Sequence, residues 1–167
     1  MSTCLSFRDV DYRSFEAVEI QLSLDHLSVV VFLCLYRPTP GKRSNLTNSM
    51  FLEEFPELLF QYTDSGRDVV YLGDFDFHYD DSSDGQVSGL KTLLSDHSLT
   101  QIVNVPTHKC GHLLDCVVVR FDSSCLSFEG VQDYHDLSDH KAADRTLAVA
   151  KPSTRRRLVT SRNIRSK

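Results

Sequence analysis

One run of almost uninterrupted apolar residues, residues 27–36 (LSVVVFLCLY), constrains the fold more than any other stretch of this chain. The run is rich in β-branched residues and has no polar face, so it predicts a strand that is covered on both sides. The preceding residues 15–24 alternate apolar and polar side chains, which is typical of a half-buried strand. Asp25 and His26 between them predict a tight hairpin turn. The chain therefore needs a layered fold around a sheet.

Helical and strand patterns alternate along the rest of the chain. Residues 49–62 have apolar residues at helical spacing, and Pro56 is expected to kink this helix or to end its first part. Residues 89–99 predict a second helix. Strands are expected at residues 68–72, 113–121, 125–131 and 145–150. Because hairpins and helical crossovers occur together, the pattern predicts a mixed-sheet α/β (α+β) layered sandwich.

Composition places the chain among globular proteins and excludes several classes. It has 167 residues, of which 41% are hydrophobic and 10% aromatic, which suits one domain with a sizeable core. The longest apolar run is too short to span a membrane, and the N-terminal residues do not resemble a secretory signal. Five cysteines without a framework spacing favour free thiols. These features predict an intracellular protein without a membrane partner.

Charge is distributed unevenly along the chain. Seven of its 18 basic residues lie in residues 151–167, which contain no acid, so the first 150 residues hold 11 basic and 23 acidic residues, a net charge of −12. The basic tail, with Arg155, Arg156 and Arg157, is expected to be a linker or to contact nucleic acid; the alternative is a solvated end. The acidic body can bind phosphate only if metal ions lie between its carboxylates and the substrate.

The strongest chemical motif follows the strand at residues 68–72. Gly73 is expected to allow a sharp turn, which leaves Asp74 at the carboxyl edge of the strand, where sites form in layered folds. In an extended segment Asp76 would point the same way as Asp74. Two carboxylates that face together repel each other unless a cation joins them, and Mg²⁺ prefers oxygen ligands. The alternative is a polar turn in which aspartates cap a loop.

A second motif joins an acid in a strand to a later histidine. Asp115 lies in an otherwise apolar segment (LLDCVVV), and a buried carboxylate is costly without a partner. We expect that partner to be His140 in the segment LSDH, because an aspartate would orient the imidazole and raise its pKa. Asp139 could serve a metal. Alternatively, Asp115 accepts backbone N–H bonds and Asp139 caps a turn.

The segments YLGDFDFH, PTHKCGHLLDCVV and LSDH, in this order, resemble the endonuclease/exonuclease/phosphatase superfamily, whose fold is DNase I-like. More narrowly, they are similar to the apurinic-type endonuclease domain of non-LTR (LINE-type) retrotransposons. The segments SFEAVEIQL, LYRPTPG and LTQIVNVPTH fit that subgroup as well. The resemblance covers about residues 14–149, which is most of the chain.

The resemblance implies roles for individual residues. Asp74 matches an acid that activates water or binds metal, and Asp76 stands where the family has a phosphate-binding Asn. Asp115 matches the acid that orients a histidine. Asp139 and His140 match the metal-side acid and the phosphate-polarising histidine. Tyr36 lies where the family has an aromatic residue that contacts phosphate.

The resemblance also implies that the fold lacks its first strands. The family's domain opens with a strand bearing an Asn and a strand bearing the main metal-binding Glu, and we expect neither Glu16 nor Glu19 to be that Glu. The expected organisation is a lead-in at residues 1–13, a partial domain at residues 14–150 and a basic tail at residues 151–167.

The function expected from the resemblance is hydrolysis of DNA phosphodiesters with Mg²⁺ (or Mn²⁺) and no small-molecule cofactor, in the nucleus. Two alternatives stay open: an inactive remnant that binds nucleic acid or a partner, and a phosphodiesterase for small molecules or lipids. Two further motifs are weaker. Ser95, Asp96 and His97 repeat the letters SDH but are expected to end a helix. A zinc site near His108 and His112 does not match common zinc spacings.

Overall fold

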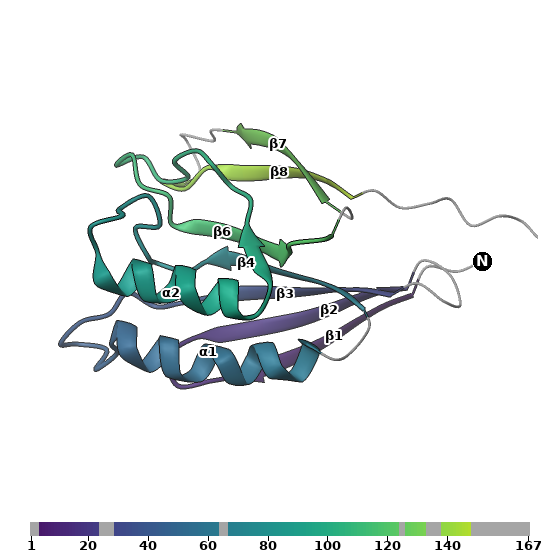
Figure 1. Cartoon of the computed structure of the whole chain (residues 1–167), viewed down its shortest axis with the longest axis horizontal. Helices are drawn as coiled ribbons and strands as arrows, with labels where there is room; N and C mark the ends of the chain where they lie inside the picture. Colours follow the sequence, from purple (N-terminus) through teal and green to yellow (C-terminus); the bar gives the residue numbers. More distant parts are fainter. Residues whose placement is uncertain (1–3, 24–28, 64–66, 124–125, 133–137, 148–167) are drawn as a thin grey trace, which may run out of the picture.

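A computed structural model describes residues 4–23, 29–63, 67–123, 126–132 and 138–147 of the chain. These residues form two helices and eight strands (Figure 1). The helices are α1 (Asn48–Thr63) and α2 (Gly85–Asp96). The strands are β1 (Cys4–Asp11), β2 (Glu16–Ser23), β3 (Val29–Tyr36), β4 (Asp68–Asp74), β5 (Leu99–Gln101), β6 (Asp115–Arg120), β7 (Leu126–Gln132) and β8 (Ala142–Leu147).

Six strands form one mixed sheet in the order β1-β2-β3-β4-β6-β5. Strands β3 and β4 are parallel and joined through α1, whereas the other neighbours in this sheet are antiparallel. The apolar run at residues 27–36 gives β3, near the centre of the sheet, where four of its eight residues are buried. The predicted layered α/β fold with a mixed sheet is therefore confirmed.

Both helices cover the same face of this sheet (Figure 1). Aromatic residues of α1 reach the strands: Phe55 packs edge-on against Tyr71 of β4, and Tyr62 donates a hydrogen bond to Glu19 of β2. Tyr71 thus faces the helices. Because side chains alternate along a strand, Asp74, three positions further along β4, faces away from them. Pro56 lies inside α1 and does not end it.

The second sheet of the described residues has only two strands, β7 and β8, which pair antiparallel with an irregularity between Phe128 and Gly130. It lies beyond β6, away from α1 (Figure 1). An isolated bridge between His108 and His140 connects the loop before β8 to the loop before β6. The two sheets therefore meet where β6 begins.

The remaining differences from the sequence predictions are local. Residues 4–11 were expected to be a lead-in, but they form β1, which pairs with β2 along its whole length; the domain limits themselves stay predictions. The second helix begins at Gly85 rather than Gly89, because the Asp84 side chain caps it by accepting from the Gln86 N–H. His97 caps its C-terminus, as expected for the second SDH segment. The turn expected at Asp25 and His26 lies outside the described residues.

Neither helix in the described part of the chain has the length and apolar run that a membrane crossing needs. Three cysteines within the described residues, Cys34, Cys110 and Cys116, are free thiols.

Candidate active site

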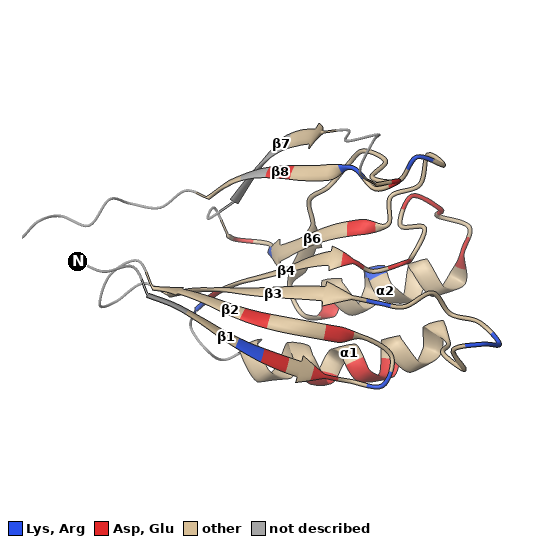
Figure 2. Ribbon diagram, turned by 180° about the vertical axis from the view of Figure 1, so that it is seen from behind, with Lys and Arg blue, Asp and Glu red and all other residues tan. Residues whose placement is uncertain are grey.

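Three of the predicted site residues lie in one row across the sheet. Tyr36 is opposite Asp74 in the β3–β4 register, and Asp74 is opposite Asp115 in the β4–β6 register. Residues opposite each other in a sheet project to the same face, so these three side chains share the face away from the helices. The row continues through Glu16 and Asp11 at the ends of β2 and β1. Figure 2 shows acidic residues gathered along this end of the sheet.

Gly73 fixes how closely β4 approaches β3 just before Asp74. Its φ is 135°, and a Cβ at this position would lie 1.9 Å from the Leu35 carbonyl oxygen. No side chain can fit there without moving the backbone. The glycine is therefore required by the close approach of two strands, in addition to any turn that follows.

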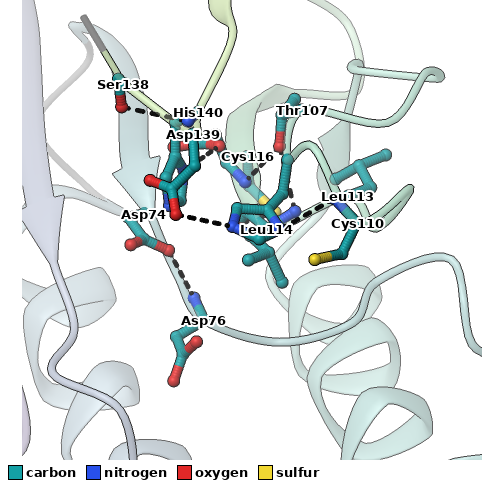
Figure 3. A network of polar contacts seen from close by, with 12 residues as sticks. Asp74, Asp76, Thr107, Cys110, Leu113, Leu114, Cys116, Ser138, Asp139 and His140 are labelled. Atoms are coloured by element: carbon teal, nitrogen blue, oxygen red, sulfur yellow. Dashed lines mark hydrogen bonds and ion pairs between the residues drawn. The ribbon is translucent and has the colours of Figure 1, made fainter. Parts of the chain in front are cut away.

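The turn after Asp74 differs from the extended segment that the sequence predicted. The Asp76 N–H donates to Asp74 Oδ1 at 3.0 Å, and Asp76 has a φ of 47°. This left-handed conformation is tolerated best by glycine, asparagine and aspartate. In Figure 3 the Asp76 carboxylate points away from that of Asp74. The expectation that both carboxylates point the same way is wrong, because the chain leaves the strand conformation at this turn.

The expected contact between Asp115 and His140 is present, with Asp115 Oδ2 and His140 Nδ1 2.9 Å apart. An ionised carboxylate only accepts hydrogen bonds, so Nδ1 carries the proton and Nε2 of the neutral ring is an acceptor. Buried Thr107 supports Asp115: its Oγ1 accepts from the N–H groups of Leu114 and Asp115. Thr107, Leu114 and His140 lie close together in Figure 3.

Backbone hydrogen bonds fix the loop that carries His140 to the loop that carries Thr107. Lys141 N–H donates to the Thr107 carbonyl at 2.7 Å, and Lys109 N–H donates to the Asp139 carbonyl at 2.9 Å. The Asp139 carboxylate lies 3.2 Å from Lys109 Nζ and 3.4 Å from His108 Nε2. The His108 ring also packs edge-on against His140. Two segments far apart in the sequence therefore form one unit.

The charges of this unit shift the pKa values of its members. Burial raises the pKa of Asp74, and the charges of Asp115 and Asp76 raise it further, against the Asp76 N–H and His140. Burial alone would lower the pKa of His140, but the hydrogen bond to Asp115 and the negative charges of Asp115, Asp74 and Asp139 outweigh it, so the net shift is upward. The hydrogen bond from Lys109 is the main cause that lowers the pKa of Asp139.

The donor set of this site fits a divalent cation. Asp74 and Asp115 are adjacent half-buried carboxylates whose repulsion a cation would relieve. His108, Asp139 and His140 also offer donor atoms that lie within 4.8 Å of one another. His108 is a poorer ligand than this spacing suggests, because its Nδ1 accepts from the Cys110 N–H and its Nε2 is then the protonated nitrogen.

The structure thus brings Asp74, Asp115, Asp139 and His140 together, with the exposed ring of Tyr36 in the same row. Their roles stay predictions. Arg155, Arg156 and Arg157 lie outside the described residues. The zinc alternative gains no support, because His112 instead pairs with Asp80 and Cys116 is buried in the sheet.

Glu19 lies away from this site, buried in β2, where it accepts from Tyr62 and pairs with Arg8 at 2.6 Å. Glu16 is exposed at the end of β2. Sequence reasoning missed two polar residues of the site, Thr107 and Arg37, which are both buried. Their positions beside prolines, in PTH and YRP, were visible, but their burial depends on packing that no local pattern specifies.

Comparison with solved structures identifies the arrangement. The endonuclease domain of TRAS1, a telomere-specific non-LTR retrotransposon, superposes with a TM-score of 0.63 at 16% identity, over 86% of this chain and 67% of that chain. A humanized TDP2 of D. rerio gives a TM-score of 0.57 at 9% identity, over 81% and 63%. An endonuclease/exonuclease/phosphatase from Beutenbergia cavernae gives 0.54 at 17% identity, over 80% and 39%.

This chain has the endonuclease/exonuclease/phosphatase fold. At these identities the likeness concerns the fold. The chain spans 67%, 63% and 39% of the length of these three solved chains. No family model matches the sequence, and a search of curated proteins finds no match.

Proposed function

We propose that this chain hydrolyses DNA phosphodiester bonds with the help of Mg²⁺ or Mn²⁺. The observation that carries the proposal is the convergence of Asp74, Asp115 and His140 at one end of the sheet, in a fold shared with nucleases and phosphatases. Each of these residues comes from a different segment, and each matches a position that the family resemblance assigns to phosphodiester hydrolysis.

His140 is the residue best placed to act on the phosphate. Asp115 holds its Nδ1–H at 2.9 Å, which fixes the ring and favours the charged imidazolium. The upward shift of its pKa keeps a larger share of the imidazole protonated near neutral pH. A protonated Nε2 can donate a hydrogen bond to a phosphate oxygen and stabilise the charge that builds up there during attack by water.

Asp74 is the residue best placed to orient the attacking water. One of its oxygens is fixed by the Asp76 N–H, which leaves the other oxygen available as an acceptor. A divalent cation, when bound by Asp74 and Asp139, would offset the charge of the carboxylates and of the phosphate. Tyr36 has an exposed ring in the same row and can contact a sugar or phosphate.

DNA is the substrate that the available observations favour. The solved structure with the highest TM-score of those compared above is described as an endonuclease domain of a retrotransposon. The basic tail, which includes Arg155, Arg156 and Arg157, would supply the phosphate contacts that an acidic body lacks. The superfamily fold also occurs in a mannosyl-6-phosphatase, so a panel of DNA, phospholipid and sugar phosphate is the right comparison.

The experiment is a plasmid-nicking assay with the full chain. We expect nicking that requires Mg²⁺ or Mn²⁺, that EDTA stops, and that falls by about 100-fold or more in Asp74→Asn and His140→Gln. His112→Gln is the matched control, because His112 also pairs with an aspartate but lies outside the proposed machinery. Absence of metal-dependent nicking in the wild-type chain would contradict the proposal.

A second candidate function is binding of nucleic acid without cleavage. Two observations favour it. Within the described residues the second sheet has two strands, and the group of possible metal ligands found there, His108, Asp139 and His140, contains no glutamate. In this case DNA binding measured by fluorescence anisotropy would survive Asp74→Asn and His140→Gln, and no nicking would occur. Loss of binding in an Arg155, Arg156 and Arg157 triple alanine variant would assign that binding to the tail.

A further inference from the structure

Arg37 is a buried cation beside the candidate active site. It follows Tyr36 at the end of β3 and is only 2% exposed. Burial is the main cause that lowers its pKa, to about 10, against the attraction of Asp76 and Asp74, so the guanidinium stays charged at neutral pH. A buried charge is destabilising unless its hydrogen bonds are satisfied. Its acceptors therefore indicate what this arginine does.

Those acceptors are neutral and belong mainly to the turn that follows Asp74. Arg37 Nη1 donates to the carbonyl oxygens of Phe75 at 2.9 Å and of Asp76 at 3.1 Å. Nη2 donates to Asn48 Oδ1 at the start of α1. The backbone N–H of Arg37 donates to the Asp74 carbonyl at 3.0 Å. One residue thus binds the carbonyl groups of all three residues of the turn.

Two aromatic rings hold the guanidinium in this position. Its central carbon lies 4.2 Å from the centre of the Phe77 ring and 5.3 Å from that of Phe51. Phe77 comes from the loop after the turn, and Phe51 comes from α1. The planar guanidinium can stack on a ring and donate two parallel hydrogen bonds at once, which a lysine ammonium cannot do.

The turn needs such support because of its own conformation. Asp76 has a left-handed backbone with a φ of 47°, a conformation that is unfavourable for most residues with a side chain. That conformation aims the Asp76 N–H at Asp74 Oδ1 and so sets the direction of the Asp74 carboxylate. If the carbonyl groups of Phe75 and Asp76 lost their donor, the turn would be free to relax toward a commoner conformation.

We propose that Arg37 is a positioning residue that holds the turn of residues 74–76 so that the Asp74 carboxylate faces Asp115 and His140. The catalytic part of this proposal rests on the proposed function, whereas the structural part does not. A purely structural arginine would fill space between α1 and the loop and affect stability alone. A positioning arginine affects stability, the direction of Asp74 and, through it, metal binding.

The test uses Arg37→Lys, which keeps the charge, and Arg37→Met, which keeps most of the apolar volume. Arg8→Lys is the control, because Arg8 serves the separate buried Glu19 and lies away from the turn. We expect kcat for nicking to fall by about 100-fold in both Arg37 variants with little change in KM. Arg8→Lys should keep the wild-type kcat even if its melting temperature falls by as much as that of the Arg37 variants.

Two further measurements separate failure of this proposal from failure of the proposed function. We expect Mn²⁺ affinity, measured by electron paramagnetic resonance on the full chain, to weaken by about tenfold in Arg37→Lys. We also expect a crystal structure of Arg37→Lys to show the Asp74 carboxylate turned away from Asp115. An unchanged turn in that structure overturns the proposal, whether or not the wild-type chain nicks DNA. If Arg37→Met does not fold, Arg37→Lys still decides.

Discussion

Two of the aspartate–histidine pairs near the start of β6, Asp115–His140 and Asp80–His112, differ in their exposure and in their neighbours. Asp115 and His140 are 2.9 Å apart with side chains 23% and 30% exposed. Asp80 and His112 are 3.3 Å apart, and each side chain is 39% exposed. Asp115 is supported by buried Thr107 and faces Asp74 across the strands. The His112 ring stacks at 3.9 Å on the exposed His78 instead.

The difference shows that the neighbours of a pair, rather than the pair itself, indicate function. An exposed pair with solvent and another ring around it contributes little to stability. The pair between the two sheets has further carboxylates around it, Asp74 and Asp139, whose charges act on His140. Of the two pairs, Asp115–His140 combines an imidazole oriented by a carboxylate with nearby donor atoms suited to a cation.

The largest expected effect comes from breaking each pair in turn. Asp115→Asn should lower metal-dependent nicking by about 100-fold or more, because an amide cannot stabilise the charged imidazole. Asp80→Asn should change the rate by less than about threefold, because that pair is exposed. The measurement is the initial rate of plasmid nicking at saturating Mg²⁺. Similar losses in both variants would contradict the distinction between the pairs.

A smaller effect is expected from removing the support of Asp115. Thr107→Val keeps the shape but leaves the N–H groups of Leu114 and Asp115 without their acceptor, so we expect a loss of about 1–3 kcal/mol in the free energy of unfolding. Ser83→Ala, in the exposed loop after Asp80, should cost less than about 0.5 kcal/mol. Urea unfolding of the two variants measures both values, and equal losses would argue against a special role for Thr107.

The smallest effect is a change of stability with pH in the absence of metal. The folded-state pKa of His140 is raised, so its stabilising contribution is complete below the unfolded-state pKa and is lost as pH rises through the folded-state pKa. The raised pKa of Asp74 acts in the same direction. The free energy of unfolding of the wild type should therefore exceed that of His140→Gln by more at about pH 5.5 than at about pH 8.5. Unfolding in EDTA at both values tests this, and a pH-independent difference would refute it.

The sequence was sufficient for the elements whose pattern is local. The apolar run at residues 27–36 predicted β3, and helical spacing predicted α1. The family resemblance, rather than a local pattern, predicted that Asp74 and Asp115 belong to one site. The direction of Asp76 could not be predicted, since it follows from a left-handed turn. Burial of Arg37 and Thr107 depends on contacts with α1 and with the loop before β8, which are distant in the sequence.

The crowding at Gly73 has a consequence for any survey of variants of this protein. A methyl group there would meet the Leu35 carbonyl and push apart the two central parallel strands, one of which ends in Asp74, the acid proposed to orient water. A mutational scan that measures activity would therefore rank Gly73, which has no reactive side chain, as high as the proposed catalytic residues. Only a separate measurement of folded protein would reveal that its importance is mechanical rather than chemical.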